Sequence, residues 1–131
     1  MSASPAPAGA VEVRAPGGAL LARAQVARTA WTRMRGLIGR PLAEGEGLLF
    51  RSCSSVHTHF MSYPIDVLYL SRDDVVVKVV APLRPWRFSW GGRGAKHVLE
   101  LPSGTAAARG IERGDVLALR AAGAAEAAAV R

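Results

Sequence analysis

Short apolar segments with an alternating pattern, each bounded by a turn, constrain the fold of this chain more than any other feature. Residues 11–14 and 20–26 flank Pro16-Gly17-Gly18, and residues 65–70 and 75–80 flank a polar run of four residues, 71–74. Apolar residues at every second position between Gly, Pro and Asp turns are typical of paired strands. The sequence therefore predicts two β-hairpins.

Four further segments are rich in branched or apolar residues and short enough to be strands. They are residues 48–50, 54–61, 96–101 and 116–119. Residues 84–94, RPWRFSWGGRG, lie between the second hairpin and the segment 96–101. They hold too many Gly and Trp residues for a regular element. We expect a loop there.

Two short helices are expected beside the strands. Helical spacing relates four apolar residues, Trp31, Met34, Leu37 and Ile38. Thr29 is a suitable N-cap for a helix over residues 29–39, and Ser103 can cap a second helical turn through 106–109 that Gly110 ends. The elements together predict an α+β, β-rich fold with an antiparallel, barrel-like sheet and two short helices.

The length of 131 residues fits one domain. We expect a disordered N-terminal segment at residues 1–10, a single β-rich domain at 11–120 and an Ala-rich flexible tail at 121–131. The apolar runs are shorter than the roughly 18 residues that a membrane span needs, and the first ten residues lack the basic and apolar regions of a secretory signal. These features predict a soluble, cytoplasmic protein without a membrane span, and we expect it to be a monomer.

The charge of the chain leaves a nucleic-acid partner open. The formal net charge is +7, but 15 of the 17 basic residues are Arg in a chain also rich in Ala and Gly, a bias that a GC-rich genome imposes on any protein. Trp86 and Trp90 alternate with Arg84, Arg87 and Arg93, and such a loop at residues 84–93 could stack on bases and hold phosphates. The same tryptophans could instead pin the loop to the sheet.

Residues 52–66, SCSSVHTHFMSYPID, bring the only cysteine close in sequence to two histidines, a methionine and an aspartate. In an extended strand Cys53, His57 and Met61 share one face with His59. Thiolate, imidazole and thioether suit soft metals, copper(I) above all, so Cys53, His57 and Met61 are candidate metal ligands. The alternative is structural, with Cys53 as a small buried residue, Met61 in the core and the histidines hydrogen-bonded at a sheet edge.

A nucleophilic role for Cys53, with His57 as its base and Asp66 orienting the imidazole, is disfavoured. Four residues of extended strand separate the first two by roughly 13 Å at Cα, too far for a hydrogen bond. No Gly-rich strand-to-helix turn accompanies the cysteine to stabilise an oxyanion. We therefore expect no enzymatic activity from this segment.

Two carboxylates in apolar surroundings need partners. Asp66 opens an apolar strand, where an unpaired carboxylate is costly to bury, so we expect it to bond backbone amides or a hydroxyl such as that of Thr58. Glu100 lies between Leu99 and Leu101. Its side chain is expected on the opposite face, either solvated or paired with an Arg.

Several motifs resemble the domain-of-unknown-function family 192 of small bacterial and archaeal proteins. They are RGLIGRP (35–41), EGLLF (46–50), CSSVHT (53–58), FMSYPIDVLYL (60–70), APLRPWR (81–87), VLELPSGTA (98–106) and the closing GIERGDVLAL. The resemblance implies a compact β-rich domain with small helices, no established enzymatic activity and, for this chain, the branch without an export signal. The positions that match are Cys53, His57, Thr58, Met61, Pro64, Asp66, Pro85, Glu100, Gly104, Gly114 and Asp115, whereas His59 and Asp73-Asp74 depart from the pattern.

These observations predict a binding or adaptor module without catalysis, for an unknown protein or small ligand and with no cofactor. His57, Thr58 and Asp66 are expected to form a hydrogen-bonded network that shapes a cleft. The candidate binding residues are Cys53, His57, Thr58, Met61, Asp66, Trp86 and Glu100. Copper binding through Cys53, His57 and Met61, and nucleic-acid binding through residues 84–93, remain the alternatives.

Overall fold

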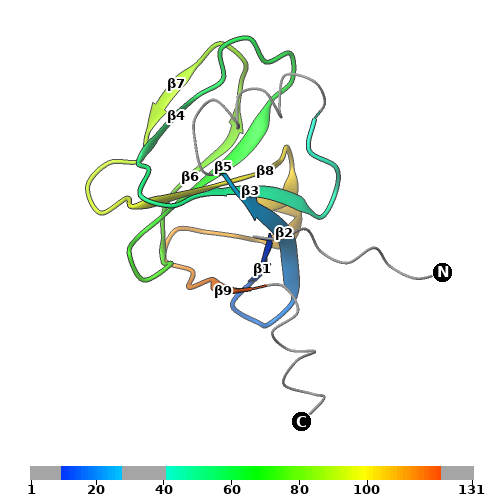
Figure 1. Ribbon diagram of the computed structural model, residues 1–131, viewed down its shortest axis with the longest axis vertical. Helices are drawn as coiled ribbons and strands as arrows, with labels where there is room; N and C mark the ends of the chain where they lie inside the picture. The colour runs from blue at the N-terminus through cyan, green and yellow to red at the C-terminus, as the bar shows by residue number, and fades with distance from the viewer. Residues whose placement is uncertain (1–9, 28–40, 122–131) are drawn as a thin grey trace, which may run out of the picture.

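Nine strands and one short helix make up the part of the chain that the structure, a computed structural model, describes, namely residues 10–27 and 41–121 (Figure 1). The strands are β1 (Ala10–Arg14), β2 (Leu20–Val26), β3 (Glu46–Phe50), β4 (Ser55–His57), β5 (Ile65–Leu70), β6 (Val76–Leu83), β7 (Phe88–Trp90), β8 (His97–Pro102) and β9 (Ala118–Ala121). The helix is α2 (Thr105–Arg109). The expected disordered segment at 1–10 and flexible tail at 121–131 lie outside the described residues except for Ala10 and Ala121, which belong to β1 and β9.

Both expected hairpins are confirmed. Strands β1 and β2 pair antiparallel around the Pro-Gly-Gly turn, and β5 and β6 pair antiparallel around residues 71–74. Ser71 fixes the second turn, because its Oγ accepts hydrogen bonds from the Asp73 and Val75 amides at 3.2 and 3.1 Å. A serine hydroxyl that bonds its own turn is a common local device.

The main sheet is mixed and open, so the expected antiparallel barrel is wrong. Its strand order is β6-β5-β8-β3-β2-β1-β9, and β2 runs parallel to β3. The edge strands β6 and β9 are not neighbours in this order; an isolated bridge between Val75 and Val116 links the chain just before each of them. Alternation specifies strands but not their partners, and the connection from Val26 to Glu46 is long enough for the crossover that a parallel pair needs.

Strand β5 is buried along its whole length because a core cluster lies on each side of it. Leu68 and Leu70 contact the first cluster, together with Leu99 and Leu101 of β8. The alternate residues Ile65, Val67 and Tyr69 contact the second cluster, with Phe50, Val56, Met61 and Leu83 among its other members. A central strand buried on both faces carries an almost continuous apolar run.

A two-stranded ribbon of β4 and β7 covers the second cluster and lies at the opposite end of the molecule from β1 and β9 (Figure 1). Strand β7 lies inside the segment that was expected to be a loop, and β4 is shorter than the expected strand over 54–61. Residue 58 ends the pairing, because the Met61 amide donates back to the Thr58 carbonyl at 3.2 Å and turns the chain. Gly91 follows β7 where the Tyr69 ring leaves no room for a Cβ.

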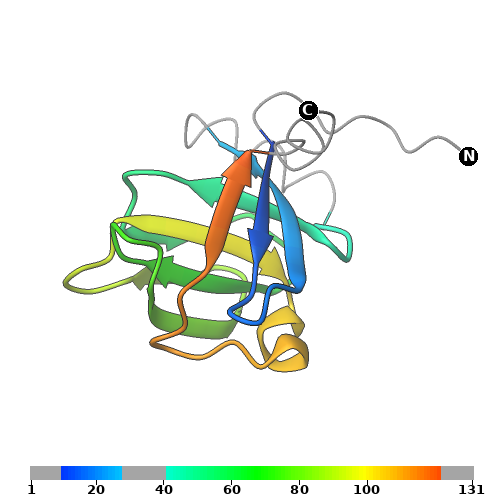
Figure 2. The ribbon, with the colours of Figure 1, turned by 90° about the horizontal axis from the view of Figure 1, so that it is seen from below.

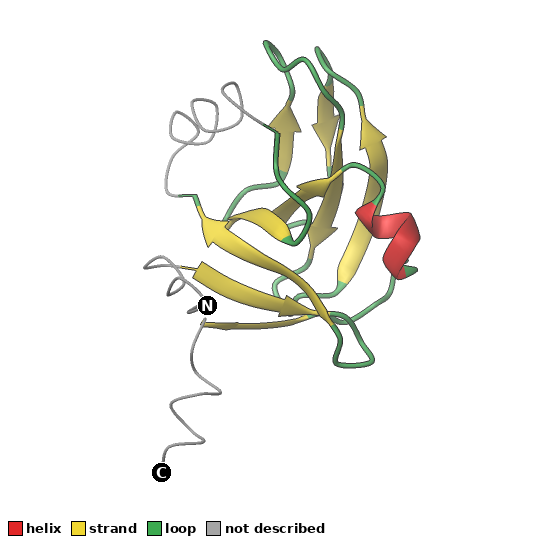
Figure 3. Ribbon diagram, turned by 90° about the vertical axis from the view of Figure 1, so that its right-hand side faces the viewer, coloured by secondary structure: helices red, strands yellow, loops and turns green. Residues whose placement is uncertain are grey.

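The helix α2 confirms the expected helical turn and its end at Gly110, which has φ 64°. Ser103 is not its cap: the N-cap is Gly104, and the buried carboxylate of Asp66 accepts a hydrogen bond from the Ala106 amide in the first turn. Figure 3 shows this helix beside the sheet. The other expected helix, residues 29–39, lies entirely outside the described residues.

The last strand begins two residues later than expected, at Ala118 instead of residue 116. It pairs antiparallel with β1, and Val11 lies opposite Ala121. Figure 2 shows the two strands side by side from below. The two ends of the described domain are therefore neighbours. Within the described ranges, no helix is long and apolar enough to cross a bilayer.

Candidate functional site

The outer face of the β4–β7 ribbon carries a row of aromatic side chains. Phe88 and Trp90 share this face because Ser89, between them, is buried. His57 lies directly opposite Phe88 in the register of the ribbon, and Ser55 lies opposite Trp90. Cross-strand partners have Cβ atoms roughly 5 Å apart, so the imidazole of His57 and the Phe88 ring are neighbours on this surface.

Ring contacts extend the row beyond the ribbon. The centroids of His57 and His59 are 5.3 Å apart, His59 and Trp86 are 5.6 Å apart in a T-shaped arrangement, and Trp86 and Phe60 are 4.9 Å apart. These separations fall in the range of attractive aromatic pairs. We call this surface the aromatic row; its members are Phe60, Trp86, Phe88 and Trp90 with His57 and His59.

The four large rings of the aromatic row are open to solvent. The exposed fractions are 64% for Phe60, 54% for Trp86, 67% for Phe88 and 56% for Trp90. The tryptophans are therefore not buried against the sheet, and the two roles considered for them, anchoring the loop or stacking on a ligand, stay predictions. Contiguous exposed apolar surface of this kind marks interaction sites in soluble proteins.

The backbone holds two of these rings outward at a conformational cost. Phe60 and Trp86 have φ of 68° and 61°, the left-handed region that bulky residues avoid. Such positions cost about 1–3 kcal/mol each, persist only where surrounding contacts enforce them, and concentrate at functional sites. Here the enforcing contact joins the two turns, since the Trp86 amide donates to the Thr58 carbonyl at 3.0 Å.

Thr58 is the buried clamp beneath the row. Its amide donates to the Arg87 carbonyl at 2.8 Å, while its hydroxyl donates to the Arg84 carbonyl at 2.5 Å and accepts from the Arg87 amide at 3.0 Å. The side chain has no exposed surface. A single threonine thus fixes the position of the turn that carries Trp86 between two arginines.

The sequence segments that contain the row have basic residues and no acidic ones. Residues 51–65 and 75–99 contain no Asp or Glu, and their charged residues are Arg51, Lys78, Arg84, Arg87, Arg93 and Lys96. Arg51 pairs with Asp74 at 3.1 Å, and Lys78 donates to the Trp90 carbonyl at 2.8 Å. The other four side chains are exposed, and none of them forms an ion pair within residues 10–27 and 41–121.

The expected network of His57, Thr58 and Asp66 is not formed among the described residues. Asp66 is buried away from the row, where its Oδ2 accepts the 2.9 Å hydrogen bond from the Ala106 amide. A backbone amide was one of the two partners expected for it. Thr58 bonds the 84–87 turn instead, so these two residues belong to different elements.

Met61 and Glu100 are also remote from solvent. Met61 is a member of the second core cluster. Glu100 is fully buried in β8, so a solvated position for it is wrong. Among the residues expected to form a cleft, only His57 and Trp86 have side chains on the aromatic row, and Thr58 supports it from below.

Cys53 lies at a second place, a cavity of about 470 Å³ next to β8. Its thiol donates to the Ser55 carbonyl at 3.1 Å, and the Ser52 amide donates to Nδ1 of His97 at 3.1 Å. Burial and the nearby Arg51 guanidinium lower the pKa of His97 from 6.5. No group of three or more His, Cys, Asp or Glu in the described part of the chain could hold a metal ion, and binding by Cys53, His57 and Met61 stays a prediction.

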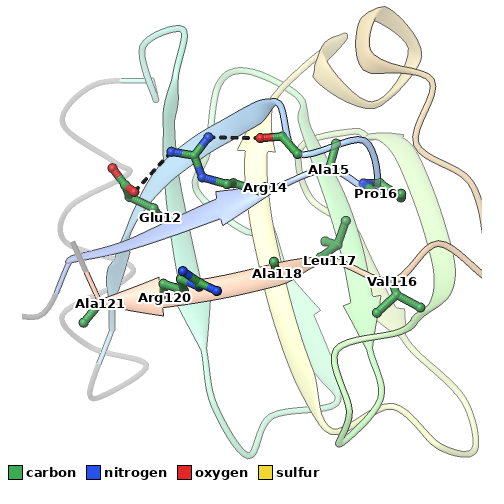
Figure 4. A pocket seen from close by; sticks show the side chains of 10 residues that line it. Glu12, Arg14, Ala15, Pro16, Val116, Leu117, Ala118, Arg120 and Ala121 are labelled. Atoms are coloured by element: carbon green, nitrogen blue, oxygen red, sulfur yellow. Dashed lines mark hydrogen bonds and ion pairs between the residues drawn. The ribbon is translucent and has the colours of Figure 1, made fainter. Parts of the chain in front are cut away.

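A third place, at the β1–β9 end, is a cavity of about 350 Å³ lined by residues of both strands and of the first turn (Figure 4). Arg14 occupies part of it, donating to the Gly18 carbonyl at 3.0 Å and pairing with Glu12 at 3.5 Å. Arg14 is thus already engaged with its own hairpin. No residue selected from the sequence lies in this cavity.

Sequence reasoning missed Phe60 and Phe88 as surface residues. Phe60 falls in the segment 54–61 that was expected to be a strand, in which alternation would place it opposite His57 and His59. Phe88 falls in the segment 84–94 that was expected to be a loop. The signal that could have found Phe88 is its alternation with Ser89 and Trp90, the pattern of a half-buried strand.

Comparison with known proteins places these features in a family. The model of the family DUF192, described as "Uncharacterized ACR", matches residues 11–119. A UPF0127 protein of Thermococcus sibiricus is 35% identical over 99 residues, which cover 71% of this chain and 63% of the relative. A UPF0127 protein of Pyrococcus furiosus is 42% identical over 64 residues, 49% of this chain and 54% of the relative. The chain therefore spans less than two thirds of the length of these relatives.

A solved structure agrees with the fold. The crystal structure of a protein of unknown function from Novosphingobium aromaticivorans superposes with a TM-score of 0.70 at 24% identity, and the match covers 90% of this chain and 93% of that one. Likeness at this identity concerns the arrangement of the backbone. The mixed, open sheet is therefore a fold already seen by crystallography.

Proposed function

Since this chain belongs to the DUF192 family, whose description names no chemistry, we propose from its own surface that it is a binding module without catalysis and that the aromatic row is its binding site. The observation that carries the proposal is the exposure of four large rings, each more than half open to solvent, on one strand ribbon and its adjoining turns. Leaving such apolar surface in water is unfavourable, and a partner that covers it gains that free energy back.

The composition of the row supports binding. Tryptophan and arginine are the residues that most often dominate the binding energy of an interface, and both are present in the 84–87 turn. The left-handed backbone of Phe60 and Trp86 and the Thr58 clamp hold the rings in place before any partner arrives. A pre-organised surface loses less conformational entropy on binding.

The proposal is tested with a panel of ligand classes and a double variant, Phe88→Thr with Trp90→Thr. Threonine keeps the β-propensity of both positions while removing the rings. Wild-type and variant chains are compared against displayed random peptides, single-stranded oligonucleotides and an oligosaccharide array. The matched control is Val116→Thr, because Val116 is another exposed apolar residue and lies before β9, away from the row.

A ligand class that binds the wild type and the Val116→Thr control, and that the double variant loses, supports the proposal. Melting temperatures of all three chains, measured by circular dichroism, establish that they are folded. If every class that binds the wild type binds the double variant equally well, or if none binds the wild type, the aromatic row is not a binding site.

A further inference from the structure

We propose that the aromatic row binds single-stranded nucleic acid, an inference that rests on the binding role proposed above and names the ligand. Proteins that hold single strands combine aromatic side chains, on which the bases stack, with basic groups that follow the phosphates. The β4–β7 ribbon, the 84–87 turn and the residues that follow β7 carry exposed side chains of both kinds. The two components are separable by mutation, which makes the inference testable.

The basic residues near the aromatic row favour a ligand with many negative charges. Residues 51–65 and 75–99, which include every member of the aromatic row, carry basic residues and no acidic one. Arg84, Arg87 and Arg93 are exposed and form no ion pair in the described part of the chain. Arg87 donates one exposed hydrogen bond, to the Trp86 carbonyl at 3.4 Å, which leaves its other N–H groups for a phosphate. A positively charged surface attracts phosphate through release of the bound counterions.

Ring spacing selects a single strand. Phe88 and Trp90 stand on the same face of β7 two residues apart, roughly 6.6 Å along the strand. That is about twice the 3.4 Å rise of one strand in a duplex. Each ring can therefore meet the face of its own base when the strand is extended, whereas a duplex keeps those faces inside its stack.

The 84–87 turn places a ring beside two cations. Trp86 follows Arg84 by two residues and precedes Arg87 directly, and Thr58 holds the backbone on both sides through the Arg84 carbonyl and the Arg87 amide. The ring is exposed between guanidinium groups that are exposed as well. A base on Trp86 and the phosphates flanking that base match this order of groups.

The experiment measures fluorescence anisotropy of end-labelled oligonucleotides of about 16 nucleotides, the upper range for a small single-strand site. Thymidine and uridine homo-oligomers separate DNA from RNA, and a duplex of the same length tests the need for exposed bases. The variants are Phe88→Thr, Phe88→Tyr and Arg87→Gln. The matched charge control is Arg120→Gln, because Arg120 lies on β9 at the other end of the molecule.

We expect Phe88→Thr to weaken binding of the single strand roughly five- to 150-fold, the usual loss per stacked base. Phe88→Tyr keeps an aromatic ring and should bind with the affinity of the wild type. Each single-strand phosphate contact contributes about 0.7 to the slope of log K against log salt. Arg87→Gln should lower the slope by about that amount, and Arg120→Gln should leave it unchanged.

Equal effects of Arg87→Gln and Arg120→Gln, binding of the duplex as tight as that of the single strand, or an unchanged affinity of Phe88→Thr would each overturn the inference. The binding role itself has a separate fate. If displayed peptides bind through the row, are lost with the Phe88→Thr, Trp90→Thr double variant, and oligonucleotides do not bind, the proposed function stands with a protein as its partner and the nucleic-acid inference fails.

Discussion

Replacing Gly91 by alanine should strongly destabilise the domain. The added Cβ would lie 2.3 Å from Cδ1 and 2.6 Å from Cγ of Tyr69, and 2.7 Å from the Cβ of Ala95. All three distances are shorter than carbon atoms tolerate, and Tyr69 is fully buried in β5, so its ring has no free space to enter. The ribbon or the central strand must shift.

The cost follows from known overpacking. Extra methylenes in a filled core cost about 1–3 kcal/mol, and three simultaneous clashes place Gly91→Ala at the upper end, about 3 kcal/mol. Each kcal/mol lowers the melting temperature by roughly 4–8 °C for 60–100 residues and by roughly 2–4 °C for 150–250 residues. A chain of 131 residues lies between these sizes, so about 4 °C per kcal/mol gives an expected decrease of about 12 °C. Thermal and urea unfolding followed by circular dichroism measure it.

Two controls make the test specific. Gly17→Ala places its Cβ where no atom lies within 4 Å, so its stability should change by no more than about 0.5 kcal/mol. A double variant, Gly91→Ala with Tyr69→Ala, should lose less than the sum of its single variants, because alanine lacks the Cγ and Cδ1 atoms that the new Cβ would meet. A Gly91→Ala chain as stable as Gly17→Ala would refute the steric reasoning.

Three other predictions concern residues away from the row. The pKa of His97 is lowered from 6.5 on folding, so the unfolded chain binds the proton more readily than the folded chain. The contribution of His97 to stability is complete above pH 6.5 and is lost as the pH falls below 6.5. The melting temperature of His97→Gln should therefore fall less between about pH 7.5 and about pH 5.5 than that of the wild type. Asp66→Ala should cost about 1–3 kcal/mol in urea unfolding, since it leaves the Ala106 amide without its acceptor, but should not change ligand binding by the folded protein; weaker binding would return Asp66 to the site. Anaerobic titration of copper(I) against a chelator should give no one-to-one complex that depends on Cys53 and Met61. Strand β4 ends at His57, so strand alternation does not bring Met61 to the same face, and Met61 lies in the second core cluster. A one-to-one complex that a Cys53→Ser, Met61→Leu variant loses would establish the metal site.

Local pattern was sufficient where neighbouring segments pair with each other. The two hairpins follow from turns whose residues favour reversal, and the end of α2 follows from Gly110, which adopts the left-handed conformation of a helix C-terminus. The parallel pair of β2 and β3 could not be found in this way. Its two strands are separated by a long connection, and the alternation of apolar residues is the same for parallel and antiparallel partners.

The site was predicted less well than the fold because distant contacts determine it. Thr58 was selected, but its partners are the backbone groups of Arg84 and Arg87, 26 and 29 residues away. Those contacts end β4 and turn Phe60 to the surface, which no property of the segment 54–61 reveals. The partner of Asp66 is also distant in sequence, since the Ala106 amide is 40 residues away. This amide belongs to the helix that Ser103 was expected to cap.

The pairing of β1 with β9 determines how the domain can be attached to anything else. Ala10 begins β1 and Ala121 ends β9, and Figure 1 shows these two strands at the end of the molecule opposite β4 and β7. A tag, a support or an additional polypeptide joined through either residue would be tethered on that side. The rings of Trp86, Phe88 and Trp90 would then lie at the end of the domain that is farther from the point of attachment.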